Sequence, residues 1–173
     1  MIPARATKSM PPIARASPAS PVAKEASRIL VVEDHPFVRE GIVRLIERQN
    51  DLRCCGEAET ISETPALAMD KRPDLVLLDL NLKDGEAFSL IPVLRRQSPS
   101  TPVLILSHTD DLGAVDKALQ LGARGYVLKG SAIEETIAAI RAALRGEVYL
   151  SPELSQRLQQ RSHSATAKSI SRV

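Results

Sequence analysis

The chain has 173 residues, which fits one domain with tails, and 43% of them are hydrophobic but only 2% aromatic, so its core must be aliphatic. No stretch approaches the roughly 20 apolar residues of a membrane-spanning helix, and no apolar segment follows the basic N-terminus as in a secretory signal. The full chain carries a net charge of +2, and its first 28 and last 19 residues carry +4 each, so residues 29–154 carry −6. A negatively charged domain is not expected to bind the phosphate backbone of a nucleic acid.

The N-terminal part predicts a tail followed by the first strand and helix. Residues 1–27 are rich in Pro, Ala and Ser, so we expect them to be disordered and ordered structure to begin near Arg28. The continuous apolar run 29–32 is typical of a strand that is buried on both faces. Pro36 favours the start of a helix directly afterwards. Apolar residues recur in this helix with helical spacing, at Val38, Ile42, Leu45 and Ile46.

The middle of the chain predicts two more strands and two weaker helices. Residues 52–58 form a less apolar second strand, and residues 75–79 form a third that is apolar up to its terminal acid. The segment 61–71 predicts a weak helix that a proline interrupts. The segment 87–97 predicts a helix in which Pro92 causes a kink or a late start.

The last third predicts two further strands, each followed by a helix. Residues 103–106 and 125–128 are apolar runs of strand length, and residues 110–121 form a helix that Gly122 ends. The final helix spans residues 131–145. Its apolar stripe consists of Ile133, Ile137, Ile140 and Leu144.

Five strand–helix units in succession define an α/β protein with a doubly wound, five-stranded parallel sheet, because right-handed crossovers place helices on both faces. We predict this domain at residues 28–146. A linker with a short helix follows at 147–161, and the Ser-rich, basic residues 162–173 are expected to be disordered.

A reactive polar residue follows four of the predicted strands. Glu33 and Asp34 follow the first, Asp79 the third, Ser107 the fourth and Lys129 the fifth. Ligands of parallel sheets bind just outside the carboxyl ends of the strands, so we expect these residues to converge. Three carboxylates there would raise one another's pKa unless a cation lay between them, and Mg²⁺ suits such oxygens. The pattern therefore predicts a site that grips a phosphoryl group through a hard cation.

Each of these residues also has a purely structural explanation. Asp34 and Ser107 could be helix caps, Asp79 could start an Asx-turn, and Lys129 could simply be solvated. Their shared position after a strand is what favours a site over four separate structural roles.

The two cysteines, Cys54 and Cys55, are adjacent in the second strand and point to opposite faces, so they cannot easily pair with each other. We interpret them as packing residues in a reducing cytoplasm, with a redox role as the alternative.

Three motifs carry a resemblance to a known family. Residues 29–36 (ILVVEDHP), 74–81 (DLVLLDLN) and 122–129 (GARGYVLK) resemble the receiver domain of bacterial two-component response regulators. The resemblance covers residues 28–146 and implies a flavodoxin-like, three-layer (βα)5 sandwich. The Asp-His-Pro after the first strand and the stretch 146–153 resemble the NarL/FixJ branch of that family.

The resemblance implies that Asp79 is the phosphoacceptor and that Mg²⁺ is the cofactor. It implies that the metal is held by Glu33, Asp34 and Asp79 together with the backbone carbonyl of Asn81.

The resemblance also implies that Ser107 and Lys129 hold the phosphoryl group and that Tyr126 is the aromatic switch residue. A plain strand residue with a solvent-facing hydroxyl is the alternative for Tyr126. Two departures concern the loop after the phosphoacceptor. Lys83 stands where the family usually has Pro, and Ala87 where it often has Gly, so this loop could differ in shape.

The partner implied by the resemblance is a sensor histidine kinase or a phosphotransfer protein, in the cytoplasm and without a membrane. The chain would be phosphorylated once and would not be a turnover enzyme. Its output would be a surface for a partner or for a homodimer.

Regulators of the NarL/FixJ branch carry a helix-turn-helix domain after this linker, whereas residues 159–173 show no apolar periodicity before the chain stops at Val173. We therefore expect no DNA binding from this chain alone, with a truncated DNA-binding transcriptional regulator as the alternative.

Two other classes are disfavoured. Aspartate-nucleophile phosphatases have Asp-x-Asp at the nucleophile, but Asn81 follows Asp79 here. A flavin site would need a phosphate-cradling loop after the first strand, where this chain has acids.

Overall fold

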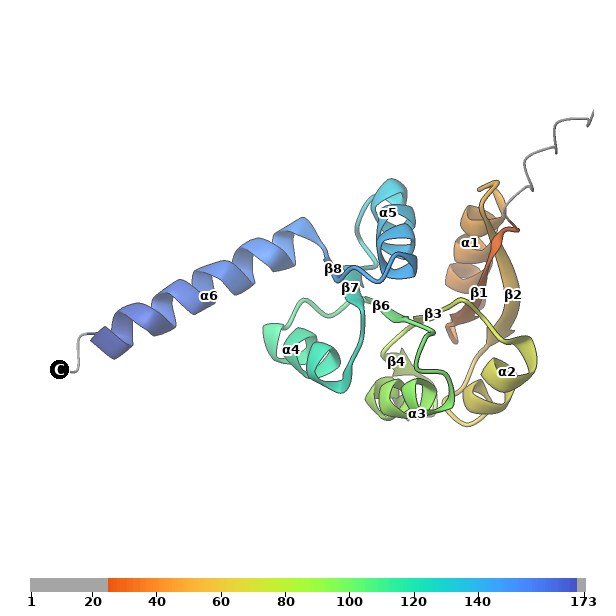
Figure 1. Cartoon of the computed structure of the whole chain (residues 1–173), viewed down its shortest axis with the longest axis horizontal. Helices are drawn as coiled ribbons and strands as arrows, with labels where there is room; N and C mark the ends of the chain where they lie inside the picture. The colour runs from red at the N-terminus through yellow and green to blue at the C-terminus, as the bar shows by residue number, and fades with distance from the viewer. Residues whose placement is uncertain (1–24, 171–173) are drawn as a thin grey trace, which may run out of the picture.

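The computed structural model describes residues 25–170, with side chains through residue 161 (Figure 1). Its main sheet has six parallel strands in the order β2-β1-β3-β6-β7-β8, so the predicted doubly wound sheet is confirmed but has one strand more than expected. The disorder expected for residues 1–27 lies outside the described part for residues 1–24, and it is wrong for Ser27, which already belongs to the first strand. The strands are β1 (Ser27–Val32), β2 (Leu52–Ala58), β3 (Leu75–Leu78), β6 (Val103–Ser107), β7 (Gly125–Leu128) and β8 (Tyr149–Leu150).

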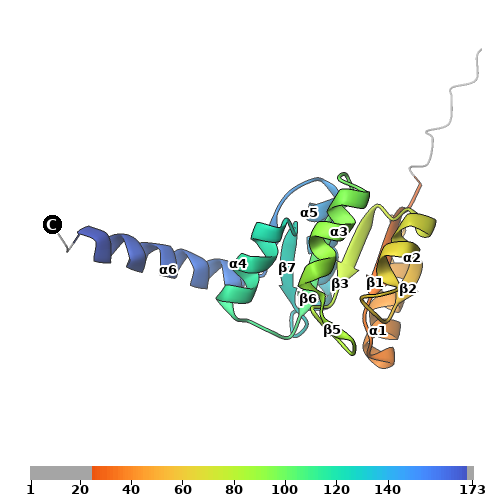
Figure 2. The ribbon, with the colours of Figure 1, turned by 90° about the horizontal axis from the view of Figure 1, so that it is seen from below.

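Helices cover both faces of the sheet, which gives the three layers expected from right-handed crossovers. Helices α1 and α5 lie on one face, and α2, α3 and α4 lie on the other (Figures 1 and 2). The helix after β8 extends away from the sheet beside α4. The helices are α1 (Pro36–Glu47), α2 (Thr64–Lys71), α3 (Leu90–Gln97), α4 (Leu112–Leu121), α5 (Ile133–Leu144) and α6 (Pro152–Ile170).

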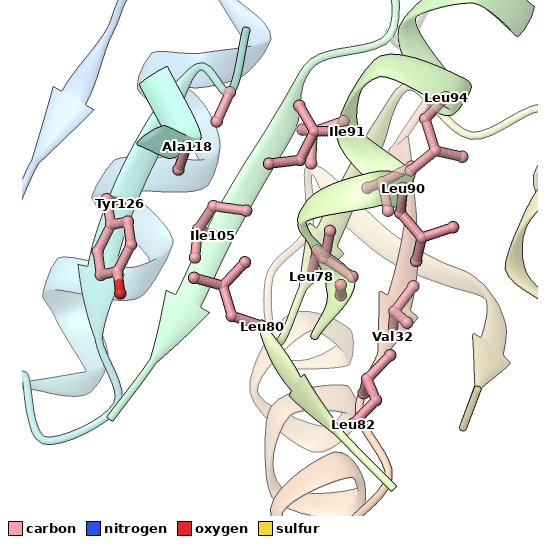
Figure 3. Close-up of a cluster of buried hydrophobic side chains, with 14 of the residues drawn as sticks. Val32, Leu78, Leu80, Leu82, Leu90, Ile91, Leu94, Ile105, Ala118 and Tyr126 are labelled. Carbon is pink, nitrogen blue, oxygen red and sulfur yellow. The ribbon is translucent and has the colours of Figure 1, made fainter. Parts of the chain in front are cut away.

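Two apolar clusters form the core, one on each face of the sheet. In β1, Leu30 and Val32 point into the cluster under α2, α3 and α4, whereas Ile29 and Val31 point into the cluster under α1 and α5. Both sets are fully buried or nearly so, which is why the strands read as unbroken apolar runs. Figure 3 shows part of the first cluster, in which Tyr126 packs among aliphatic side chains.

Prolines set the starts of two helices. Helix α2 begins at Thr64 and not at residue 61 as predicted, because Pro65 sits in the first turn, where no intrahelical N–H is needed. Helix α3 begins late, at Leu90, after a 3-10 turn over Ala87–Ser89, and Pro92 again lies in the first turn. The predicted late start is therefore confirmed.

The segment after β3 is more regular than a loop. It contains a short antiparallel pair, β4 (Asn81–Leu82) and β5 (Gly85–Glu86), that the sequence did not predict. Two-residue strands are too short to give an alternating pattern.

The C-terminal part differs most from the prediction. The segment predicted as a linker contains β8, and the helix predicted to be short runs from Pro152 to Ile170. The expected disorder of residues 162–173 is therefore wrong for the backbone of residues 162–170. In α5, Ile133 is 59% exposed and lies outside the buried stripe, because it is the first residue of the helix.

A glycine lets β8 approach β7 closely. A Cβ atom at Gly125 would lie 2.5 Å from the Tyr149 carbonyl oxygen and 2.8 Å from a Leu104 methyl group. Because neither the strand backbone nor the core side chain can easily retreat, only glycine fits at this position.

Within residues 25–170, no helix combines the length and the apolar content that crossing a bilayer requires.

We expect Gly125→Ala to lower the free energy of unfolding by about 1–3 kcal/mol, because the added methyl group overpacks the contact between β7 and β8. Urea unfolding followed by far-UV circular dichroism measures this change.

Gly41→Ala is the matched control. Gly41 lies within α1, and a Cβ atom added there would meet nothing within 4 Å, so alanine should raise stability by about 0.5–1 kcal/mol. Equal destabilisation by the two variants would contradict the close approach.

Candidate functional site

The predicted site residues meet where β1, β3, β6 and β7 end. Parallel pairing continues one residue past the strands, since the backbone N–H of Asp79 donates to the Val32 carbonyl at 2.9 Å. The N–H of Lys129 likewise donates to the Ser107 carbonyl at 2.9 Å. These bonds fix the side chains of neighbouring strand ends beside one another.

A buried ion-pair triad lies at the centre of the site. The Lys129 ammonium is 2.5 Å from Oε2 of Glu33 and 2.7 Å from Oδ2 of Asp79. All three side chains are at most 5% exposed. Burial of two carboxylates is costly unless a counter-ion is in place, so Lys129 is needed to keep both of them here.

Burial shifts the pKa of the central carboxyl group. It raises the pKa of Asp79 above the ordinary value, while Lys129 and the Asn81 backbone N–H, which donates to Oδ1 at 3.1 Å, oppose the rise. The same hydrogen bond forms the expected Asx-turn, so the structural role and the site role of Asp79 coexist.

Four side chains form a cluster suited to a cation. Glu33, Asp34, His35 and Asp79 each offer a ligand atom, and these atoms all lie within 4.8 Å of one another. The buried Oδ1 of Asp34 has no hydrogen bond within the described residues, although Nδ1 of His35 lies 2.8 Å away. When ionised, three carboxylates and one ammonium, that of Lys129, leave two uncompensated negative charges. This donor set fits a hard divalent cation.

His35 is the site residue that sequence reasoning missed, because it was read only as part of the Asp-His-Pro motif at the start of the first helix. The structure does place it at the N-cap of α1, but without a side-chain capping bond. Its ring instead turns to Glu33 and Asp34, and its Nδ1 lies 3.1 Å from Oε1 of Glu33. The sequence feature that could have identified His35 as a site residue is its position directly after Glu33 and Asp34.

Ser107 and Tyr126 meet at a shared neighbour. Ser107 is fully buried, and its Oγ accepts a hydrogen bond from the Thr109 N–H at 3.2 Å. The Tyr126 hydroxyl donates to the Thr109 carbonyl at 2.8 Å. Tyr126 is 0% exposed and burial raises its pKa, so the alternative of a solvent-facing hydroxyl is wrong.

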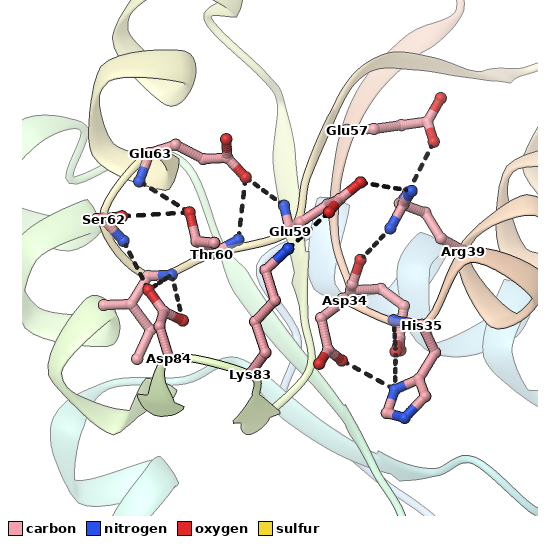
Figure 4. Close-up of polar contacts among 12 residues, drawn as sticks. Asp34, His35, Arg39, Glu57, Glu59, Thr60, Ser62, Glu63, Lys83 and Asp84 are labelled. Atoms are coloured by element: carbon pink, nitrogen blue, oxygen red, sulfur yellow. Dashed lines mark hydrogen bonds and ion pairs between the residues drawn. The ribbon is translucent and has the colours of Figure 1, made fainter.

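The loop after Asp79 is fastened to the loop before α2 (Figure 4). Lys83 pairs with Glu59 at 2.8 Å, which lowers the pKa of that carboxyl group. The Asp84 carboxylate accepts the backbone N–H groups of Ile61, at 2.9 Å, and Ser62, at 3.3 Å. The lysine at the position that departs from the family therefore contributes to this attachment.

Arg39 connects the same region to the site. Its guanidinium donates to the Glu33 carbonyl at 2.7 Å and pairs with Glu57 and Glu59 at 3.1 and 2.9 Å (Figure 4). The backbone that carries the first two acids is thus held from α1 and β2.

The cysteines are half-buried free thiols. Burial raises the pKa of Cys54 to about 11 and raises that of Cys55 as well, so both stay protonated at neutral pH. A protonated thiol is a poor nucleophile, and the redox alternative gains no support.

A hollow of about 1130 Å³ lies at the opposite end of the sheet. Its arginines include Arg72, Arg95 and Arg145, which stand at the C-terminal ends of α2, α3 and α5. Cations are favoured at helix C-termini, so the helix dipoles account for these arginines.

Comparison with known proteins agrees with this geometry. Residues 29–141 match the family described as "Response regulator receiver domain", and the chain belongs to that family. It is 34% identical over 134 residues to the transcriptional regulatory protein YdfI of Bacillus subtilis, covering 78% of this chain and 62% of that protein. It is 35% identical over 132 residues to the nitrate/nitrite response regulator protein NarL of Escherichia coli, covering 76% and 61%. The chain thus spans somewhat less than two thirds of these relatives.

A solved structure supports the fold independently. The two-component response regulator of the LuxR family from Aurantimonas sp. SI85-9A1 superposes with a TM-score of 0.76 at 33% identity. The match covers 80% of this chain and 99% of that one.

We expect wild-type stability to change with pH in a way that Asp79→Asn does not share. Because the folded state binds the Asp79 proton more tightly than the unfolded state, lowering the pH from about 7 to about 4.5 should stabilise wild type relative to the variant. Urea unfolding of both proteins in metal-free buffer tests this, and parallel pH profiles would count against the raised pKa.

Proposed function

We propose that this chain is a phosphorylatable receiver and that Asp79 accepts a phosphoryl group from the phosphohistidine of a sensor kinase or phosphotransfer protein. The observation that carries the proposal is the Asp79 carboxylate held 2.7 Å from the Lys129 ammonium beside two further acids. Family membership supports it.

Glu33, Asp34 and Asp79 would hold Mg²⁺ with the backbone carbonyl of Asn81. When bound, the ion would neutralise negative charge on the phosphoryl oxygens and draw them toward the carboxylates. The uncompensated charge of the acid cluster and the unbonded oxygen of Asp34 support this assignment.

In the transfer step an Asp79 carboxylate oxygen attacks phosphorus. The new P–O bond forms as the P–N bond to the donor histidine breaks. The bonding pair stays on the freed nitrogen, and the imidazole leaves as a neutral ring because its other nitrogen carries a proton. Lys129 is near enough to Asp79 to pair with the arriving phosphoryl oxygens, and the Ser107 hydroxyl can donate to one of them. The product is an acyl phosphate, formed once per chain, so turnover of a phosphate ester is not expected.

Phosphorylation would then bias two arrangements of the segment after Ser107. A hydroxyl drawn toward the phosphoryl group pulls on Thr109, whose carbonyl holds the Tyr126 hydroxyl. Tyr126 thereby acts as the switch residue. Within residues 25–170 no observation favours the alternative of DNA binding.

Incubation with Mg²⁺ and acetyl phosphate should label wild type once, with an acid-stable and base-labile bond. Asp79→Asn should abolish the label, because an amide cannot form the acyl phosphate. Intact-mass spectrometry gives the stoichiometry. Asp84→Asn, at an exposed acid of the neighbouring loop, is the matched control and should label like wild type. Label retained in Asp79→Asn would remove Asp79 from its role.

Lys129→Ala tests the metal site through stability. In metal-free buffer it should cost about 3–5 kcal/mol of unfolding free energy, because two buried carboxylates lose their counter-ion. Mg²⁺ should restore more stability to this variant than it adds to wild type, as urea unfolding with and without the ion will show.

The control is Lys83→Ala, which removes an exposed, solvent-screened ion pair and should therefore change stability far less than Lys129→Ala does. A Lys129→Ala protein on which Mg²⁺ has no effect would contradict the proposed ligands.

A further inference from the structure

The segment after α5 pairs with β7, the strand that carries Tyr126. The N–H of Tyr149 in β8 donates to the Arg124 carbonyl, and the N–H of Ser151, the residue after β8, donates to the Tyr126 carbonyl, both at 3.1 Å. The Ser151 hydroxyl, itself buried, accepts the Leu128 N–H at 3.2 Å. This segment therefore lies directly along the switch strand.

Helix α6 begins with an apolar anchor. Leu154 is 0% exposed and belongs to the cluster that contains Val115, Ala118 and Tyr126. The half-buried Leu158, one turn later, packs against the same cluster. The first turns of α6 are thus held by apolar burial against α4 and β7, and the rest of the helix projects away from the domain (Figure 1).

Two arginines on α6 reach across to acids of the α4 region. Nη1 of Arg157 donates to Oδ2 of Asp110 at 2.6 Å and to the Asp110 carbonyl at 3.0 Å. Nη1 of Arg161 pairs with Oδ2 of Asp116 at 3.0 Å. The Arg157 guanidinium thus contacts both the backbone and the side chain of Asp110, in the loop that precedes α4.

That loop also holds the two switch groups. Thr109, the neighbour of Asp110, donates its N–H to the Ser107 hydroxyl and accepts the Tyr126 hydroxyl. Two adjacent residues therefore connect the phosphoryl-binding hydroxyl, the switch tyrosine and α6. A displacement of Thr109 moves Asp110 with it, because the two are consecutive in the chain.

We propose that α6 reports the state of Asp79: phosphorylation shifts the 109–110 loop, weakens the contact between Arg157 and Asp110, and loosens α6 from α4. The inference rests on the function proposed above. Leu154 and β8 keep the first turn in place, whereas Leu158 is only partly buried and can leave the cluster, so the helix becomes mobile beyond Leu154 without leaving the domain. Because the ion pairs are exposed, the contact is weak enough for a shift of the loop to break it.

Hydrogen–deuterium exchange of the full chain tests the proposal, with Mg²⁺ and beryllofluoride as the phosphoryl mimic at Asp79. Amides in peptides covering residues 155–161 should exchange about two- to five-fold faster in the loaded protein. Arg157→Ala should show the faster exchange without the mimic and no further change with it. By linkage, this variant should also bind beryllofluoride about two- to five-fold more tightly than wild type.

The matched control is Gln156→Ala, at an exposed neighbouring position on α6, which should behave like wild type in both measurements. Phosphorylation with acetyl phosphate, measured by mass on the same samples, separates the two proposals. A protein that is labelled at Asp79 but whose α6 exchange is unchanged or slower would overturn the role of α6. A protein that takes up no label would refute the proposed function itself, and the role of α6 with it.

Discussion

The structure depends on the Lys129 ammonium, which is shared between the buried carboxylates of Glu33 and Asp79. Two like charges at most 3% exposed would otherwise repel each other in a region with little water to screen them. A single lysine balances only one of them, and Asp34 adds a third acid. The site is therefore short of positive charge, and the proposed binding of a divalent cation depends on this imbalance.

The sheet supplies the means to hold such a costly arrangement. Glu33 and Asp79 each come directly after a strand that is buried on both faces, and hydrogen bonds beyond the strand ends continue the parallel register into the site. The burial free energy of the two apolar clusters offsets the cost of bringing the carboxylates together. Arg39 and the pair of Lys83 with Glu59 then restrain the loops that surround the acids.

Much of this could be predicted from the sequence, because long apolar runs give the strands and the residue after each run falls at one edge. Glu33, Asp34, Asp79 and Lys129 were found in this way. The parts that were missed have weak local signals. Strand β8 has two residues and forms only because Gly125 permits its approach, which is a tertiary contact. The length of α6 was also missed, since its hydrophilic sequence shows an apolar edge only at Leu154 and Leu158.

Strand β8 also determines how much of one edge of the sheet is left unpaired. Without it, β7 would present a full row of unpaired peptide groups to any extended chain in its neighbourhood, an invitation to aggregation. The two-residue strand pairs with the first half of β7, and Pro152, two residues after it, ends the extended segment, so β8 itself presents very little free edge. The opposite border, β2, carries the charged and exposed Arg53 and Glu57. Both edges of the sheet are therefore poor templates for pairing with another extended chain.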